Sequence, residues 1–348
     1  MAEPARLGAA AVQPSPLDAL PRIAARGAPA PADFSALVAA ETPVVIKGLF
    51  DDWVALAAGR HSAGRLNAYL AGMDRGTAVP VMEAPARAGG RFAYRADMRE
   101  FTFTKRSAPL RETLARIEGL IGQENAPTVA IQMLPLADAL PEFMRQNPMP
   151  LLPAAVGPKL WLGGAVKTQT HNDRDHNLAC VIAGRRRFTL FPPEQVANLY
   201  IGPLDNPPPL SLVDPENPDH DRFPRFRDAF AVARVAVLEP GDAIFIPKYW
   251  WHHVASLDPY NAMVNYWWGN TAHGIEKPND VFLAALLALK DLPPGERAYW
   301  QAMFETHVFG DPDIASGHIP AALRGALGPM RPDERAMLRQ RLLAAFQK

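Results

Sequence analysis

Short apolar runs separated by Pro, Gly and Asn dominate the middle of the chain. Between residues 128 and 270 these runs are VAIQML, LWLGG, NLACVIAG, RRFTLF, AVARVAVL, AIFIP and NAMVNYWW. Each has the length of a strand, and several are rich in the β-branched and aromatic residues that strands favour. This succession of short strands, without helices between them, predicts a mainly β core over residues 128–270, folded as an antiparallel jelly roll.

The segments on both sides of this core have a different periodicity. Apolar residues recur at helical spacing over 33–41, 61–73, 109–121, 278–290, 294–307 and 331–346. The first three segments predict an N-terminal α/β section over residues 31–127 that packs on the core. The last three predict a C-terminal helical region over residues 271–348. Residues 1–30 are rich in Ala, Pro and Arg and are expected to form an N-terminal arm.

The composition is that of an ordinary globular protein. Of 348 residues, 48% are hydrophobic, and 36 Lys and Arg balance 36 Asp and Glu. This balance creates no global positive field, so nucleic acid is disfavoured as a partner. The neutral net charge does not exclude a local basic patch. The single cysteine, Cys180, lies in an apolar run and excludes an internal disulfide, which fits a reducing compartment. With no apolar stretch of roughly 20 residues and no secretory signal pattern, we expect a cytoplasmic protein without a membrane span.

Residues that bind transition metals occur at two places in the predicted core. His171 and Asp173 are two positions apart, and in a strand this spacing directs both side chains to one face. His252, directly after the pair Trp250-Trp251, is the best candidate for a third ligand. Two imidazoles and one carboxylate on one side of a metal are typical of non-haem Fe(II) oxygenases. The His-x-Asp spacing alone is equally compatible with a solvated strand.

The motifs around these residues resemble a known family. The stretches HNDRDHNLACVIAGRRRFTLFPPEQ, DPENPDHDRFPRF and GDAIFIPKYWWHHVASL, followed by NAMVNYWW, are similar in order and spacing to the cupin-like JmjC hydroxylases, including asparaginyl hydroxylases. The likeness is sharp over residues 160–270 and diffuse over 30–160. It implies a double-stranded β-helix that binds Fe(II) through His171, Asp173 and His252. It also implies an oxygenase that uses 2-oxoglutarate to hydroxylate a C–H bond, releasing succinate and CO₂.

The resemblance extends to the cosubstrate. Thr168, Asn177, Arg186 and Asn265 match the family positions that bind 2-oxoglutarate, and Arg186 stands where the family usually has a lysine. A buried carboxylate needs a cationic partner, and arginine can bind one through two hydrogen bonds. The tyrosine that many relatives contribute from an earlier strand has no counterpart in residues 128–133.

The sequence also predicts the orientation or the solvent exposure of other polar residues close to the candidate site. His253 has the opposite strand parity to its neighbour and should face away from the metal. His176 is expected at the rim of the site, solvated or facing the substrate. Arg185 and Arg187 are expected to be solvated. The Pro-rich segment 192–228 is predicted to be a long insertion at the barrel mouth.

Several alternatives stay open at the level of sequence. The Arg186 exchange and the absent tyrosine leave room for a metal-dependent cupin enzyme that does not use 2-oxoglutarate, and a noncatalytic JmjC-like binding protein is a further alternative. The expected substrate is a protein, a peptide or a small molecule, and the sequence does not choose among them.

The C-terminal helices carry apolar faces, such as Val281-Phe282 and Leu342-Leu343. Since such helices form a homodimer in the resembling family, a homodimer is expected here.

Overall fold

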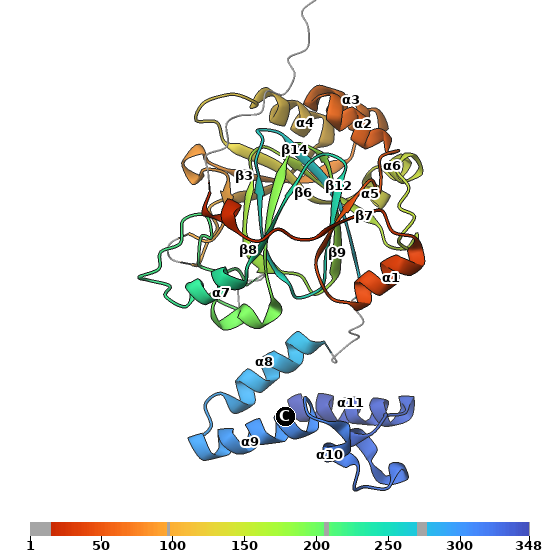
Figure 1. Ribbon diagram of the computed structural model, residues 1–348, viewed down its shortest axis with the longest axis vertical. Coiled ribbons are helices and arrows are strands. Elements are labelled where there is room, and N and C mark those ends of the chain that lie inside the picture. Colours follow the sequence, from red (N-terminus) through yellow and green to blue (C-terminus); the bar gives the residue numbers. More distant parts are fainter. Residues whose placement is uncertain (1–14, 96–97, 205–208, 270–276, 348) are drawn as a thin grey trace, which may run out of the picture. The chain divides into compact units, whose positions relative to one another are not determined.

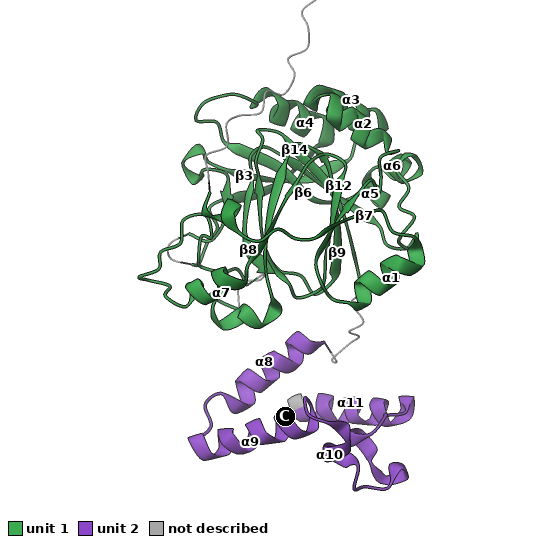
Figure 2. Ribbon diagram, in the orientation of Figure 1, with its two compact units in different colours: residues 1–270 green, residues 271–348 purple. Residues whose placement is uncertain are grey.

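The computed structural model describes residues 15–95, 98–204, 209–269 and 277–347 (Figure 1). The chain divides into two compact units, Met1–Asn270 and Thr271–Lys348 (Figure 2). Within the described ranges, no helix combines the length and the apolar character that crossing a membrane requires.

Two β-sheets form the first unit. The larger sheet has the order β1-β2-β12-β9-β14-β7-β6-β3-β5. Its strands are β1 (Ala25–Gly27), β2 (Val44–Lys47), β3 (Ala78–Ala84), β5 (Thr104–Pro109), β6 (Thr128–Pro135), β7 (Pro158–Gly163), β9 (His176–Ala183), β12 (Asp242–Ile246) and β14 (Asn261–Trp268). The smaller sheet has the order β11-β10-β13-β8-β4, from β4 (Arg91–Phe92), β8 (Lys167–Asn172), β10 (Arg186–Phe191), β11 (Arg234–Leu238) and β13 (Trp251–Ser256). Pairing is antiparallel apart from the short pairs β1–β2 and β4–β8, which are parallel.

Helices accompany the sheets of the first unit and make up the second. In the first unit they are η1 (Pro16–Ala19), α1 (Pro31–Ala39), α2 (Val54–His61), α3 (Ala63–Met73), η2 (Ala86–Ala88), α4 (Leu110–Gly119), α5 (Leu136–Ala139), α6 (Pro141–Gln146), η3 (Pro193–Ala197) and α7 (Phe226–Val232). In the second they are α8 (Pro278–Leu289), α9 (Pro294–His307), α10 (Pro312–Ser316), η5 (Ala321–Leu323), η6 (Gly325–Leu327) and α11 (Pro332–Phe346).

The two sheets enclose an apolar space, which we call the barrel interior. Both contribute to one buried cluster, which includes Val45, Ala179, Val181, Phe188, Leu190, Leu238, Ile244, Ile246, Val254 and Met263. Because side chains alternate along a strand, the residues between these face outward. The outward side chains of the larger sheet pack beneath α2, α3 and α4, which lie together over that sheet in Figure 1. Residues on the cluster's side of a strand are called inner-face residues below.

The predicted mainly β jelly roll with added helices is confirmed. The helices expected at 61–73 and 109–121 are α3 and α4, and those expected after residue 270 include α8, α9 and α11. The structure also has helices between core strands, where none was expected: α5 and α6 lie between β6 and β7, and α7 lies between β10 and β11. Leu136, Leu140 and Phe143 are spaced as on one helical face, and all three are fully buried, so packing on the sheet explains α5 and α6.

The described part of the N-terminal arm packs on the first unit. Leu17 and Leu20 join a buried cluster with Phe191 of β10 and Val235 of β11. Farther along the arm, β1 pairs with β2 at the edge of the larger sheet. The arm therefore contributes to the hydrophobic core from η1 onward.

The helices of the second unit leave large apolar side chains exposed. No side chain of α8 or α9, both described over their full length, is buried. Leu287 is 81% exposed and Phe309 is 78% exposed. A groove of about 560 Å³ is lined by residues of both helices, including Phe282, Trp300 and Phe304. A continuous apolar surface of this kind is typical of a protein–protein contact.

Candidate metal centre

The structure brings His171, Asp173 and His252 together at one end of the barrel interior. Their possible ligand atoms all lie within 4.8 Å of one another. Nε2 of His252 is 3.7 Å from Oδ2 of Asp173, and the two imidazole centroids are 4.3 Å apart. These separations are short enough for one ion to contact all three side chains.

Two neighbouring strands and one turn position these side chains. His171 on β8 and His252 on β13 are direct cross-strand partners, so their imidazoles share a face. Asp173 follows β8 in the turn toward β9. Its carbonyl accepts a hydrogen bond of 2.8 Å from the backbone N–H of Tyr249, which fixes the turn against the loop before β13.

The hydrogen bonds of both imidazoles leave Nε2 available for a metal. Nδ1 of His171 lies 2.8 Å from the carbonyl of Gln169, and Nδ1 of His252 lies 3.0 Å from the carbonyl of Trp250. With Nδ1 protonated and donating, the lone pair of each ring is on Nε2. Burial lowers the pKa of His252 to about 4, which keeps this imidazole neutral at pH 7, the form that binds metal.

The carboxylate of Asp173 completes a donor set that fits a divalent metal. Its Oδ2 atom is buried and has no hydrogen-bonding partner among the described residues. A buried carboxylate oxygen without a partner is unfavourable unless a cation or donor meets it. Two imidazoles and one carboxylate suit Fe(II), which accepts nitrogen and oxygen ligands. The residues present therefore fit the metal that the resemblance implies.

A β-bulge gives Thr168 the same orientation as His171. Along β13, His252 pairs with His171 and Val254 pairs with Thr168, so the single residue between them on β13 faces two residues, Gln169 and Thr170, on β8. In a regular strand, residues three apart point to opposite faces. Because Val254 and His252 are both inner-face residues, the bulge brings Thr168 to the inner face beside the candidate metal centre.

Arg186 extends from β10 into the barrel interior. Its cross-strand partner Leu238 belongs to the interior cluster, so both are inner-face residues. The arginine is 8% exposed, and its guanidinium has no hydrogen bond or ion pair with a described residue; its Nε atom is fully buried. Burial lowers the pKa of Arg186 to about 10, which still leaves the guanidinium charged at neutral pH.

Asn177 and Asn265 form a small polar network on the opposite sheet. Nδ2 of Asn265 donates to Oδ1 of Asn177 at 3.2 Å, and Nε1 of Trp161 donates to Oδ1 of Asn265 at 2.8 Å. The side-chain N–H groups of Asn177 have no partner among the described residues. Trp161 was not identified from the sequence, because its partner Asn265 is distant in the chain and only the register of β7 with β14 brings them together.

The structure agrees with the expectation for one of the two other histidines near the site and disagrees with it for the second. His253 faces away from the metal as expected, opposite Thr189, and is 3% exposed. The expectation of a solvated His176 is wrong: it is 8% exposed and its ring lies against Phe245 and Trp268. Aromatic residues that converge from β12 and β14 close over it.

The arginines beside Arg186 are also less solvated than expected. Arg187 is buried and pairs with Asp18 of the arm and Glu216 of the insertion, so the expectation of a solvated side chain is wrong. Arg185 is partly exposed and binds the carboxylate of Asp258 through two nitrogens. These acidic partners come from segments that are distant in the sequence. The run of three arginines therefore predicts a solvated surface when it is considered alone.

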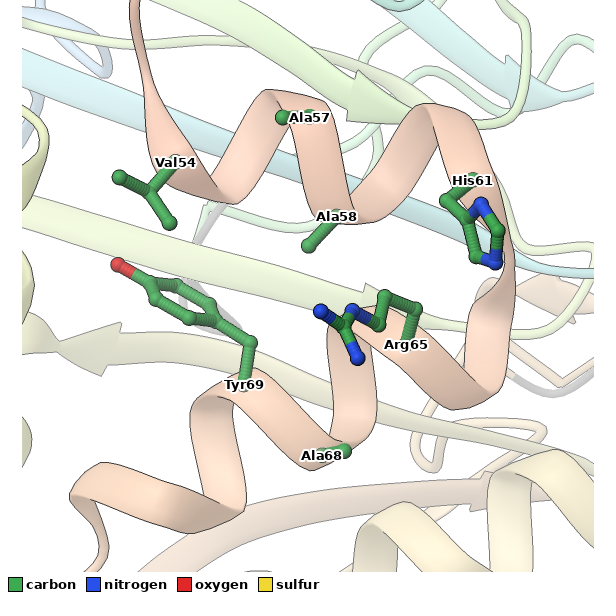
Figure 3. A pocket seen from close by; sticks show the side chains of 7 residues that line it. All are labelled: Val54, Ala57, Ala58, His61, Arg65, Ala68 and Tyr69. Carbon is green, nitrogen blue, oxygen red and sulfur yellow. The ribbon is translucent and has the colours of Figure 1, made fainter.

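A separate cleft of about 700 Å³ lies between α2 and α3 (Figure 3). Arg65 and Tyr69 extend from α3, and the small side chains of Ala57 and Ala58 on α2 and of Ala68 on α3 also line the cleft. The phenol of Tyr69 is already bound, since it accepts a hydrogen bond from Nδ2 of Asn147. This cleft belongs to the helices over the outer face of the larger sheet and contains none of the candidate metal ligands.

Comparison with known proteins identifies relatives. The family model described as "Cupin-like domain" matches residues 30–273. Human HSPB1-associated protein 1 is 39% identical over 112 residues, which cover 31% of this chain and 22% of that protein. Lysine-specific demethylase JMJ31 of Arabidopsis thaliana is 37% identical over 110 residues, covering 31% and 20%. Jumonji C domain-containing protein 5 of Drosophila melanogaster is 34% identical over 121 residues, covering 33% and 28%. The similarity thus spans less than a third of the length of each relative.

Proposed function

Because the chain belongs to the cupin-like family of JmjC-type proteins, we propose that it is an Fe(II)- and 2-oxoglutarate-dependent oxygenase that hydroxylates a C–H bond. The substrate is a protein side chain or a small molecule. His171, Asp173 and His252 hold the iron, which activates O₂ as 2-oxoglutarate is converted to succinate and CO₂.

The burial of Arg186 supports the use of 2-oxoglutarate as the cosubstrate. A charged guanidinium inside an apolar barrel, without an acidic partner among the described residues, is unfavourable unless an anion accompanies it. A dicarboxylate such as 2-oxoglutarate would supply that anion, and Arg186 shares the inner face of the smaller sheet with two of the residues that would hold the metal, His171 and His252. Thr168 lies on the same sheet between the rows of His171 and Arg186, where its hydroxyl can donate to the cosubstrate. These residues provide the donors that the absent tyrosine would otherwise supply.

The opposite sheet holds the cosubstrate from its other side. Asn265 is bound by both Trp161 and Asn177, and this orients the free N–H groups of Asn177 toward the interior. We therefore assign direct contact with 2-oxoglutarate to Asn177 and the orientation of Asn177 to Asn265. The surrounding apolar side chains limit the access of water to the reacting atoms.

Succinate formation tests the activity. The full chain, loaded with Fe(II) under anaerobic conditions, receives 2-oxoglutarate and then O₂, with and without candidate peptides and small molecules. We expect succinate from the wild type and none from His171→Ala. Absence of succinate under all of these conditions would contradict the proposal.

Calorimetric titration with the unreactive analogue N-oxalylglycine separates the rival functions. Saturable binding that requires metal supports the oxygenase. Metal binding without analogue binding points to a cupin enzyme that does not use 2-oxoglutarate. A purified protein that binds neither points to a noncatalytic binding protein.

We propose in addition that residues 271–348 form a homodimer interface. The apolar side chains of α8 and α9, including Phe282 and Leu287, need a partner surface, and a second copy of this chain supplies one. Sedimentation equilibrium at micromolar concentration is expected to give twice the 38.0 kDa chain mass. Leu287→Glu is expected to give the monomer mass, and a monomeric wild type would contradict the interface.

A further inference from the structure

The bulge beside His171 is held from outside the barrel by a residue of the insertion. The backbone N–H of Ser211 donates to the carbonyl of Thr170 at 2.8 Å. In the opposite direction, Nε2 of Gln169 donates to the carbonyl of Ser211. Ser211 is 1% exposed, and its hydroxyl donates to the carbonyl of Leu199, so it is itself fixed within the insertion. Two hydrogen bonds thus join one insertion residue to the two residues of the bulge.

Gln169 has a second set of contacts that reach the candidate metal centre. Its carbonyl is the acceptor for Nδ1 of His171 at 2.8 Å. Its side-chain Oε1 also accepts the backbone N–H of Tyr94 at 3.4 Å. The main chain of Gln169 therefore orients a metal ligand, while its side chain is held by Ser211 and Tyr94 on the outer side of the sheet.

We propose that Gln169 is a positioning residue that couples the insertion segment 209–217 to the metal ligand His171. Clamped by Ser211, its side chain fixes the bulge, and the bulge sets the direction of the carbonyl that holds the imidazole. Residues that orient a metal-binding histidine in this way typically affect metal affinity 10- to 100-fold. Coupling of this kind is reciprocal, so metal binding also stabilises the packing of the segment on β8. The inference rests on the metal site of the proposed function.

Metal affinity tests the first half of the inference. The probe is Mn(II), added to the full metal-free chain, with the free ion measured by electron paramagnetic resonance. Gln169→Met keeps the length of the side chain and removes both of its hydrogen bonds. We expect the dissociation constant to rise about tenfold. Gln123→Met is the matched control, because Gln123 also donates to one backbone carbonyl, that of Gly119, but on an exposed helix end.

Hydrogen–deuterium exchange provides a readout that a purely structural residue would not change. In the wild type, Mn(II) is expected to slow the exchange of the Ser211 amide, whose partner is Thr170. In Gln169→Met this metal-dependent protection is expected to disappear, while the metal-dependent protection of β13 remains. Gln123→Met is expected to behave as the wild type does.

The outcomes separate this inference from the function on which it rests. If the wild type does not bind Mn(II), both the metal site and the proposed function are contradicted. A wild type that binds, with equal affinity and equal Ser211 protection in Gln169→Met, overturns the coupling alone. If Gln169→Met does not fold, Gln169→Glu replaces it, because a carboxylate cannot donate to the Ser211 carbonyl, and the same tenfold loss is expected. Failure of both variants to melt cooperatively would make Gln169 a structural residue and overturn the inference.

Discussion

Replacing Arg186 with methionine is expected to change stability and cosubstrate binding in opposite directions. Without a ligand, the wild type keeps a charged group in an apolar interior, where an unpaired ion costs several kcal/mol even after relaxation. Methionine has a similar length and no charge. We therefore expect Arg186→Met to stabilise the ligand-free protein by about 2 kcal/mol. In a domain of this size, that gain raises the melting temperature by about 4–8 °C.

The same substitution removes the cation that binds the distal carboxylate. Truncating one member of a buried, hydrogen-bonded charge pair typically costs about 2–5 kcal/mol of binding free energy. The affinity for 2-oxoglutarate should fall at least about 30-fold. At 100 times its dissociation constant, 2-oxoglutarate stabilises the wild type by about 2.7 kcal/mol. The advantage of Arg186→Met in melting temperature should therefore disappear when 2-oxoglutarate is added.

Differential scanning fluorimetry of the Mn(II)-loaded proteins, with and without 2-oxoglutarate, measures both effects. Arg185→Met is the matched control, because the neighbouring arginine is paired with Asp258 and lies outside the barrel interior. It is expected to melt at or below the wild type and to keep its response to 2-oxoglutarate. A ligand-free Arg186→Met protein that melts below the wild type would refute the reasoning, since it would mean that the guanidinium is satisfied without an anion.

Other substitutions test the fold and the metal centre. Gly184 has a φ of +65°, and a Cβ there would lie 2.2 Å from the carbonyl oxygen of Tyr260, so Gly184→Ala should lower the melting temperature by more than about 4 °C. Asp173→Asn should abolish the rise in melting temperature caused by Mn(II) while leaving the metal-free protein folded. Burial lowers the pKa of His253 to about 3, so between pH 6.5 and 3 the unfolded chain binds a proton that the folded chain does not. Stability should fall as the pH drops through this window, and His253→Gln should reduce that slope in urea titrations by up to about 1.4 kcal/mol per pH unit.

The strands and the longer helices were predictable from the sequence because burial leaves a pattern in their composition. Strands between residues 128 and 270 bury one or both faces, so their composition alone indicates a β core. Helices such as α3 and α4 bury one stripe against the larger sheet, and that stripe is visible as helical spacing. The helices α5 and α6 were missed because Pro135 precedes α5, Pro141 begins α6, and their stripe has only three large residues.

The candidate site was predictable to the extent that it depends on local spacing. His171 and Asp173 are two residues apart on one strand and its following turn, and this signal is present in any reading of the sequence. The bulge that orients Thr168 left no comparable signal, because it depends on the pairing of β8 with β13 and on Ser211 in the insertion. For the same reason, the burial of Arg187 follows from Asp18 and Glu216, which no local pattern connects to it.

The direct pairing of His171 with His252 also determines when the metal centre can form during folding. The two histidines are neighbours only because β8 and β13 are adjacent strands, although an entire insertion and four other strands separate them in the chain. Such a contact requires the closure of a long loop, which is slow compared with local structure formation. An unfolded or partly folded chain can offer a metal only the His171 and Asp173 half of the donor set. Tight metal uptake should therefore follow the closure of the smaller sheet and mark one of the last steps of folding.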